Sequence, residues 1–287
     1  MNLKDIKQRI LSVKGTQKIT QAMKLVSAAK LRRAQLQIEG MRPYQHKLDS
    51  MVSSFVHHDD AGMDGLAAER DVRRVAIVAV ASDTSLCGAF NSNVIRLMRG
   101  TVDDYRSQGS EVEMFPVGQK MYDAAVKSGA SINNLLEGQS KSPVYNDVAS
   151  VAYALIDDFK SGRIDKVEIV YTRFASTSKH VPVREQLLPL KSDEQECEGK
   201  DCAIDYIVEP GRAELLQTLL PKVVALNLYT ALLDSVASEH AARMIAMQIA
   251  SDNANDLISE LTLEYNKGRQ QAITNELLDI VSGSVSE

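Results

Sequence analysis

Two stretches, one near each end of the chain, decide the fold: IKQRILSVKGTQKITQAMKLVSAAKLRRAQ at residues 6–35 and ASEHAARMIAMQIASDNA at residues 237–254. Neither contains proline, and only one glycine occurs in them. In the first, Ile6, Ile10 and Val13 step by four and then three residues, the spacing of an apolar seam along one side of a helix. The second is rich in alanine, which gives a helix a face that a neighbour can approach closely. Together the two stretches predict a pair of packed helices.

Both predicted helices are much longer than the ~12-residue norm. The first spans residues 3–55 and resumes its narrow seam with Met41, Tyr44, Leu48, Met51 and Phe55. Between the two parts of the seam, Ile19, Met23 and Val26 also gather on one side. The last helix runs from residue 212 to about 281, with no glycine between 212 and 267. Neither helix can bury its apolar side against a small domain, so we expect them to pack on each other in antiparallel directions.

The middle of the chain alternates between strand and helix patterns. Residues 75–81 form a continuous apolar run, which is typical of a buried parallel strand. Further strands are expected at 111–117, 167–174, 181–190 and 205–208, with helices at 91–106, 118–129 and 146–159. This alternation predicts an open, Rossmann-like α/β sheet.

The expected fold class is therefore α/β with a long antiparallel two-helix coiled coil. Residues 1–57 and 211–287 are expected to form the coiled-coil shaft, and residues 71–209 the central α/β domain. Residues 58–70 carry glycines among acidic residues and are expected to be a linker.

Charge is distributed unevenly along the chain. Residues 1–50 carry eleven Lys or Arg against three Asp or Glu, whereas the other 237 residues carry 22 against 35. A basic arm on an acidic body indicates a partner with acidic groups or phosphates. The composition excludes disordered, collagen-like and disulfide-framework proteins, and three cysteines fit a reducing compartment. We expect no membrane span and no signal peptide.

The sequence carries no recognisable catalytic signature. It lacks the phosphate-binding loop, the dinucleotide glycine motif, the nucleophile elbow and the HExxH zinc motif. Two alternatives remain open at this point. The basic arm favours a helical nucleic-acid-binding protein, and the turn at residues 82–91 lies where α/β sheets often hold ligands, as in a dinucleotide-binding enzyme. Cys197 and Cys202 lie in an acidic loop, where we expect inert thiols.

The longest motifs resemble those of the gamma subunits of F-type ATP synthases. Residues 6–35 resemble the opening helix of that family, and residues 237–254 resemble its C-terminal signature, which YNKGRQQAITNE at 265–276 continues. The central motif of the family is matched by LCG at residues 86–88 and NSN at residues 91–93. The resemblance covers essentially the whole chain, in the same order.

This resemblance implies a central rotor shaft that is itself non-catalytic. The terminal helices would form a coiled coil inside a ring of three alpha and three beta subunits, and the α/β domain would meet the epsilon subunit and the ring of c subunits. Ion-driven rotation of the c ring would then change the conformations of the three catalytic beta subunits. The resemblance implies no cofactor, no metal site, no nucleic-acid partner and no direct membrane span. The protein would be peripheral, on the cytoplasmic face of the bacterial inner membrane.

The resemblance also implies individual contacts. Contacts between rotor and stator are expected at Lys18, Met23, Lys24, Arg243, Gln270, Thr274 and Glu276. Contacts with the c ring and the epsilon subunit are expected at Tyr206, Glu209 and Cys87. An apolar tip that includes Ile273 and Leu277 would seat in an apolar sleeve of the ring.

Overall fold

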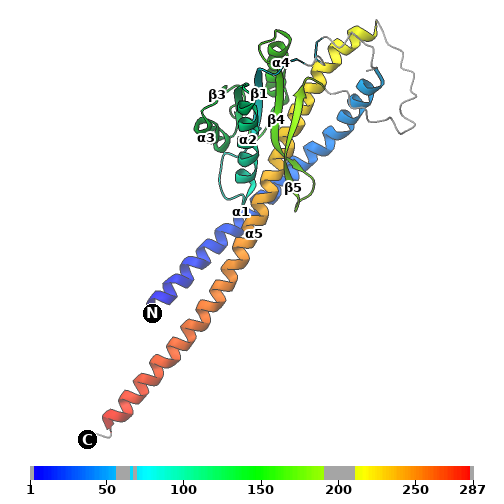
Figure 1. The fold of residues 1–287 in the computed structure, drawn as a ribbon. Helices are drawn as coiled ribbons and strands as arrows, with labels where there is room; N and C mark the ends of the chain where they lie inside the picture. Colours follow the sequence, from blue (N-terminus) through cyan, green and yellow to red (C-terminus); the bar gives the residue numbers. More distant parts are fainter. Residues whose placement is uncertain (1–2, 56–64, 67–69, 191–210, 285–287) are drawn as a thin grey trace. The chain divides into compact units, whose positions relative to one another are not determined.

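The computed structural model describes residues 3–55, 65–66, 70–190 and 211–284 of the chain. Its two longest helices are α1 (Leu3–Phe55) and α5 (Arg212–Ser284) (Figure 1). Their bounds confirm the helices expected at the two ends of the sequence. The strand expected at 205–208 lies outside the described residues, as do both cysteines of the acidic loop.

Contacts divide the chain into two compact units. One unit joins Met1–Ala28 with Arg243–Glu287, and the other is Ala29–Ala242. Each long helix therefore contributes residues to both units. The domain boundaries expected from the sequence stay a prediction.

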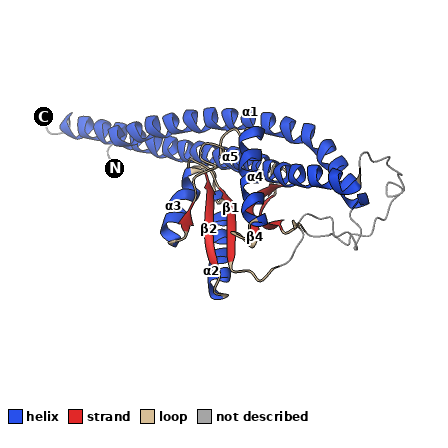
Figure 2. Cartoon of the chain, turned by 90° about the horizontal axis from the view of Figure 1, so that it is seen from above, coloured by secondary structure: helices blue, strands red, loops and turns tan. Residues whose placement is uncertain are grey.

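The first unit is an antiparallel pair of helical segments. A Cβ added at Gly268 would meet the Leu3 side chain at 3.2 Å, and the Gln17 side-chain amide donates a hydrogen bond to the Asn255 side-chain oxygen. Contact positions rise along α1 as they fall along α5, so the two segments run in opposite directions. Figure 2 shows the two chain termini at the same end of this pair. The antiparallel coiled coil expected from the sequence is confirmed.

A regular seam of less exposed residues joins these two segments. On α1 the seam follows positions 6, 10, 13, 17, 20, 24 and 27, in alternating steps of four and three. On α5 it follows positions 243, 247, 251, 254, 258, 261, 265 and 268. A mean period near 3.5 residues is that of a left-handed coiled coil.

The middle of this seam is small and polar, which the sequence did not predict. Thr20, Ser27 and Ser251 are all buried there. Ile19 and Val26, which the sequence pattern groups with the apolar side, are instead 62% and 55% exposed. These two residues share one side of α1, but it is the outer side, because a heptad that starts at Ile6 places them away from the seam.

The second unit contains a five-stranded sheet in the order β3-β2-β1-β4-β5. Its strands are β1 (Arg74–Val80), β2 (Glu111–Val117), β3 (Ser131–Ile132), β4 (Lys166–Phe174) and β5 (His180–Leu188). Strands β1, β2, β3 and β4 run parallel to one another, and β5 runs antiparallel to β4. The helices of this sheet are α2 (Phe90–Ser107), α3 (Gln119–Ser128) and α4 (Tyr145–Lys160). The expected Rossmann-like α/β fold is confirmed.

Both faces of the sheet are covered. Alternate residues of β1, such as Val75 and Ile77, pack in one core with α2 and α3, while β1 as a whole is buried along six of its seven residues. On α4, the Tyr145 ring meets the Tyr229 ring of α5 edge-on, with centroids 5.5 Å apart. In the same unit Leu48 of α1 packs against Val223 and other residues of α5. The long helices therefore take part in the core of this domain.

One glycine is required where β2 turns into α3. Gly118 has φ +90°, and a Cβ there would lie 2.2 Å from the backbone oxygen of Ala81. Only glycine combines that backbone angle with so close an approach. The turn places the N-terminus of α3 beside the end of β1.

The helix α5 also contains a window that is long and apolar enough to cross a membrane by composition. Of that window, 61% is buried inside the protein. Burial of this extent is typical of a core helix, because its apolar side chains already have protein neighbours.

Candidate coupling surface

The three rotor–stator residues expected on α1 lie in the middle of the coiled-coil segment. Lys18 is exposed, Met23 is half-buried beside the seam, and Lys24 is a half-buried residue of the seam. The backbone oxygen of Met23 accepts a hydrogen bond from the Ser27 hydroxyl at 2.8 Å. These two lysines and the thioether of Met23 are spread over about two turns of α1. Their contact with another subunit stays a prediction.

The expected residues of α5 divide into two kinds. Arg243 is buried, with 7% of its surface exposed, so it belongs to the helix pair. Gln270, Thr274 and Glu276 are exposed, and the Thr274 hydroxyl bonds to the backbone oxygen of Gln270 at 2.9 Å. These three residues follow Gly268 in the sequence, so they lie on the part of α5 that continues past its contact with Leu3.

Beyond Gly268 the helix α5 continues for sixteen residues to Ser284, about 24 Å of helix. The large apolar side chains of this tip are exposed, including Leu277 at 58% and Ile280 at 68%. An apolar helix end of this kind needs a covering surface from elsewhere.

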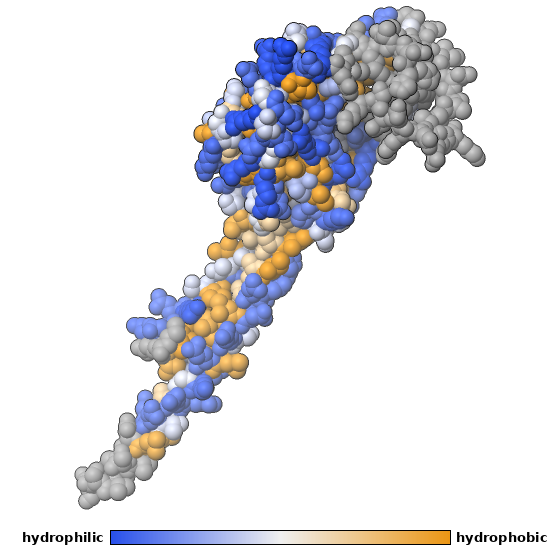
Figure 3. All heavy atoms as spheres, in the orientation of Figure 1, coloured by the Kyte–Doolittle hydropathy of each residue, from blue (hydrophilic) through white to orange (hydrophobic). Residues whose placement is uncertain are grey.

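Sequence reasoning missed a further apolar surface on the coiled coil. The large apolar side chains that are more than half exposed on this unit, besides the tip, are Leu11, Ile19, Leu25, Val26, Ile249 and Leu263. Figure 3 shows apolar patches interleaved with polar ones along these helices. The signal was present, because Ile19 and Val26 stand away from the heptad that begins at Ile6. An outer stripe is visible only once the seam register is fixed.

Cys87 lies in the loop between β1 and α2, and its thiol is buried, with the residue 2% exposed. The Asn91 side-chain amide donates to the thiol sulfur at 3.2 Å, and Cys87 packs with Phe90 and Ala242. The neighbouring Leu86 is 59% exposed and has a φ of 69°, a region that bulky residues rarely adopt. A partner at this loop would therefore meet Leu86 rather than the thiol. Tyr206 and Glu209 lie outside the described residues.

A buried ionic cluster fixes β4 and β5 beneath α2. Glu168 is 4% exposed and accepts hydrogen bonds from the Tyr105 hydroxyl at 2.5 Å and from Arg184 Nε at 2.6 Å. Lys166 Nζ lies 3.1 Å from the same carboxylate. Burial raises the pKa of Glu168, but the hydrogen bonds from these three partners outweigh burial and hold the pKa below its ordinary value. The cluster is charge-paired and structural.

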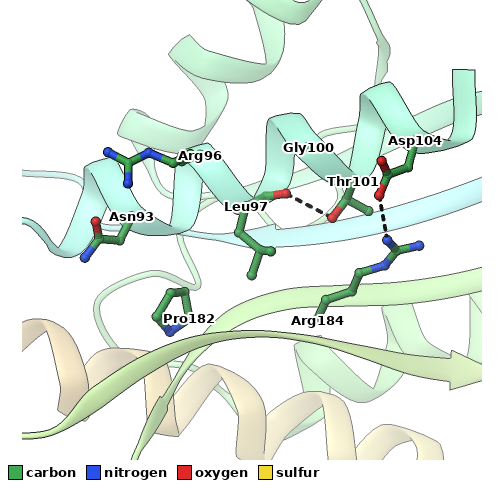
Figure 4. Close-up of a pocket in the computed structure, with 8 residues that line it drawn as sticks. All are labelled: Asn93, Arg96, Leu97, Gly100, Thr101, Asp104, Pro182 and Arg184. Carbon is green, nitrogen blue, oxygen red and sulfur yellow. Dashed lines mark hydrogen bonds and ion pairs between the residues drawn. The ribbon is translucent and has the colours of Figure 1, made fainter. Parts of the chain in front are cut away.

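Beside this cluster a groove of about 420 Å³ runs between α2 and β5. Asn93, Leu97 and Gly100 line it from α2, and Pro182 and Arg184 line it from β5 (Figure 4). None of the expected contact residues that the structure describes lines this groove.

A second hollow, of about 560 Å³, lies at the carboxyl ends of β1 and β2, the edge where α/β sheets bind ligands. Asp83 accepts the backbone N–H of Gln119, at the start of α3, at 3.0 Å and pairs with Lys141 at 3.3 Å. Burial raises the pKa of Asp83, but its hydrogen bonds, with Gln119 foremost, hold the pKa below the ordinary value. The chain's own carboxylate thus takes the place of a bound phosphate at this helix end. This arrangement does not favour a dinucleotide-binding enzyme.

Comparisons with known proteins all match ATP synthase chains. A family model described as ATP synthase matches residues 2–286. The chain is 46% identical over 295 residues to the ATP synthase gamma chain of Bacteroides thetaiotaomicron, and 47% identical over 287 residues to that of Phocaeicola vulgatus. Each alignment covers 99% of both chains.

Solved structures share the fold. A chain from the Euglena gracilis mitochondrial ATP synthase (OSCP, F1 and c-ring, rotational state 3) is 19% identical, with a TM-score of 0.68 over 99% of this chain and 94% of that chain. A chain from the central stalk and c-ring of the Tetrahymena thermophila mitochondrial enzyme is 24% identical, with a TM-score of 0.59 over 81% of this chain and 99% of that chain.

Proposed function

The chain belongs to the ATP synthase gamma-chain family, and from this premise we propose that it is the central shaft of a rotary ATP synthase. Rotation of a membrane c ring, driven by ion flow, turns the shaft. The turning shaft presents different sides to three catalytic beta subunits and so changes their conformations in sequence. The chain carries no catalytic site of its own in this proposal. A nucleic-acid-binding function finds no support in the relatives.

The observation that carries the proposal is the surface of the coiled-coil unit. A helix pair normally hides its large apolar residues, yet Leu25 and Leu263 are 69% and 72% exposed. They alternate with polar groups and with exposed lysines such as Lys18. Exposed charge pairs are worth about 0–1 kcal/mol each. A surface of many small, separate contacts suits a shaft that must break and remake them at every step.

The partners follow from the family. We propose that three alpha and three beta subunits surround the coiled coil, and that the epsilon subunit and the c ring meet the α/β domain. We also propose that the complex lies on the cytoplasmic face of the bacterial inner membrane, with this chain as a peripheral subunit.

The contacts proposed for the shaft keep the residues expected from the sequence. Lys18, Met23 and Lys24 face an acidic lever of a beta subunit. Gln270 and Thr274, on the exposed part of α5, contact the upper part of the ring. The outer apolar residues such as Ile19 add contacts between these two levels.

Purification of the tagged chain from gently solubilised membranes tests the function. Native mass measurement counts the subunits that accompany it. The expected result is one copy of this chain with three alpha and three beta subunits. A free monomer, or a complex with nucleic acid, would overturn the proposal.

A further inference from the structure

Two side chains of α5, one turn apart, hold the end of strand β4. The Ser238 hydroxyl donates to the backbone oxygen of Thr172 at 3.1 Å. The backbone N–H of Phe174 donates to the Asp234 carboxylate. Ser238 is fully buried and Asp234 is 9% exposed, so both bonds are sheltered from water.

The spacing of the two bonds matches on both elements. Residues four apart on a helix are separated by about 6.0 Å along its axis, and residues two apart on a strand by about 6.6 Å. Positions 234 and 238 therefore meet positions 174 and 172 at the same time. A slip of α5 by one residue moves the side chains by about 1.5 Å along the axis and turns them by about 100°. Such a slip breaks both bonds.

The next turn of α5 extends the same row. Ala242 packs with Cys87 and Phe90 at the start of α2. Asp234, Ser238 and Ala242 follow one another at intervals of four, so one line of the helix lies against the domain. Arg42 of α1 and Arg173 of β4 both attract the Asp234 carboxylate. The row thus engages the sheet, α2 and the other long helix.

We propose that Asp234 and Ser238 form the joint through which the α/β domain turns helix α5. The proposal rests on the proposed function and adds to it the residues that pass torque from the domain to the shaft. The hydrophobic effect is non-directional, whereas hydrogen bonds weaken steeply when their angle changes. Two backbone-directed bonds in matched register therefore resist rotation of the helix against the sheet. Asp234 and Ser238 act as positioning residues.

The joint also offers a matched control. The Thr172 hydroxyl, beside the bonded carbonyl, is buried and has no partner within the described part of the chain. Ser238 bonds to the backbone of Thr172 and not to its side chain. Thr172→Val therefore keeps the joint while removing a polar atom from the same place.

The first test uses the isolated full-length chain and hydrogen exchange. Asp234→Ala removes the acceptor of the Phe174 amide, so that amide should exchange about tenfold faster, as for the loss of one buried hydrogen bond. Asp234→Asn keeps an acceptor oxygen and should restore the slow rate. An unchanged Phe174 rate in Asp234→Ala overturns the joint.

The second test uses the purified complex in vesicles and measures protons pumped per ATP hydrolysed. The double variant Asp234→Ala/Ser238→Ala should lose pumping while ATP hydrolysis continues, because the helix slips against the domain. Thr172→Val should keep the wild-type ratio. Met121→Ala, which destabilises the buried core of α3 away from the joint, should also keep it.

An unchanged ratio in the double variant overturns the torque role. An equal loss in Met121→Ala also overturns it, because the effect then follows stability alone. Failure of the wild-type chain to accompany the alpha and beta subunits is a separate result, seen in the subunit count. That result overturns the proposed function, and the torque role with it.

Discussion

Replacement of Asp234 by asparagine should make the protein more stable at neutral pH and leave it unchanged in acid. Burial raises the pKa of Asp234 from 3.8 to about 6, and the Phe174 amide, Arg42 and Arg173 only partly offset burial. The folded chain therefore holds the proton more tightly than the unfolded chain does. This is the opposite of a carboxylate stabilised by a salt bridge.

The sign and size follow from these two pKa values. Below pH 3.8 the carboxyl is protonated in both states and carries no penalty. Above about pH 6 it is ionised in both states, and the folded state bears the whole penalty of a buried charge. A shift of roughly two pKa units corresponds to about 3 kcal/mol. The contribution of Asp234 to stability thus falls by about that amount as pH rises from 4 to 6.

Urea unfolding of the full-length chain across pH 4–8 measures the effect. The quantity of interest is the free energy of unfolding of Asp234→Asn minus that of the wild type at each pH. It should rise from near zero at pH 4 toward about 3 kcal/mol at pH 7.5, since the amide stays neutral and still accepts from Phe174. Other titrating groups cancel in the difference.

Asp83 provides the control, because the same substitution there should have the opposite sign. Its pKa is lowered by hydrogen bonds that outweigh burial, so Asp83→Asn should destabilise the chain at neutral pH and have little effect in acid. A difference for Asp234→Asn that stays flat with pH, or that falls as it does for Asp83→Asn, would refute the reasoning. The carboxylate would then be stabilised in the fold.

Three further outcomes are expected. Glu168→Ala should lower the free energy of unfolding by about 1–3 kcal/mol, because it leaves the buried Tyr105 hydroxyl without its acceptor and removes the carboxylate that Lys166 and Arg184 share. Urea unfolding measures this, and an unchanged free energy of unfolding would contradict it. Gly118→Ala should destabilise the protein strongly, since the new Cβ would meet the Ala81 backbone oxygen. Gly100→Ala adds a Cβ that meets nothing within 4 Å, so it should stabilise α2 by about 0.5–1 kcal/mol. Thermal unfolding of both variants measures this contrast, and equal effects on the melting temperature would refute it. Met23→Lys should lower the protons pumped per ATP hydrolysed by adding charge at the proposed beta contact, and an unchanged ratio in an assembled complex speaks against that contact.

The long helices and the parallel strands were predictable because each depends on local patterns. The seam spacing from Ile6 and the absence of glycine between 212 and 267 indicated α1 and α5. The apolar run at 75–81 indicated β1, and Gly129, with φ +66°, ends α3 as expected. The strand β3 was missed because Ser131–Ile132 is only two residues long, too short for any periodicity.

The features that depend on distant parts of the sequence were not predictable. Glu168 reads as an interruption of an apolar strand, and only the fold brings Tyr105 and Arg184 to it. The bond from Ser238 joins residues 66 positions apart in the sequence. The polar middle of the coiled coil was missed for a different reason, since hydrophobic periodicity cannot mark a seam made of Thr20 and Ser27. The candidate contact residues came from the resemblance alone. The exposed apolar surface that supports their role could be recognised only from the solvent exposure of each side chain in the structure.

Because residues 3–28 pair with residues 243–284, the coiled coil cannot form until the C-terminal segment has been synthesised. During synthesis the first helical segment leaves the ribosome long before its partner exists. At about 5–20 residues per second, roughly 10–50 s separate the synthesis of residue 28 from that of residue 268. Throughout that interval the seam residues that α5 later buries, such as Ile6 and Thr20, have no helix beside them. The coiled-coil unit is therefore the last part of the protein that can form, and a chain released before residue 243 leaves its N-terminal segment without a partner.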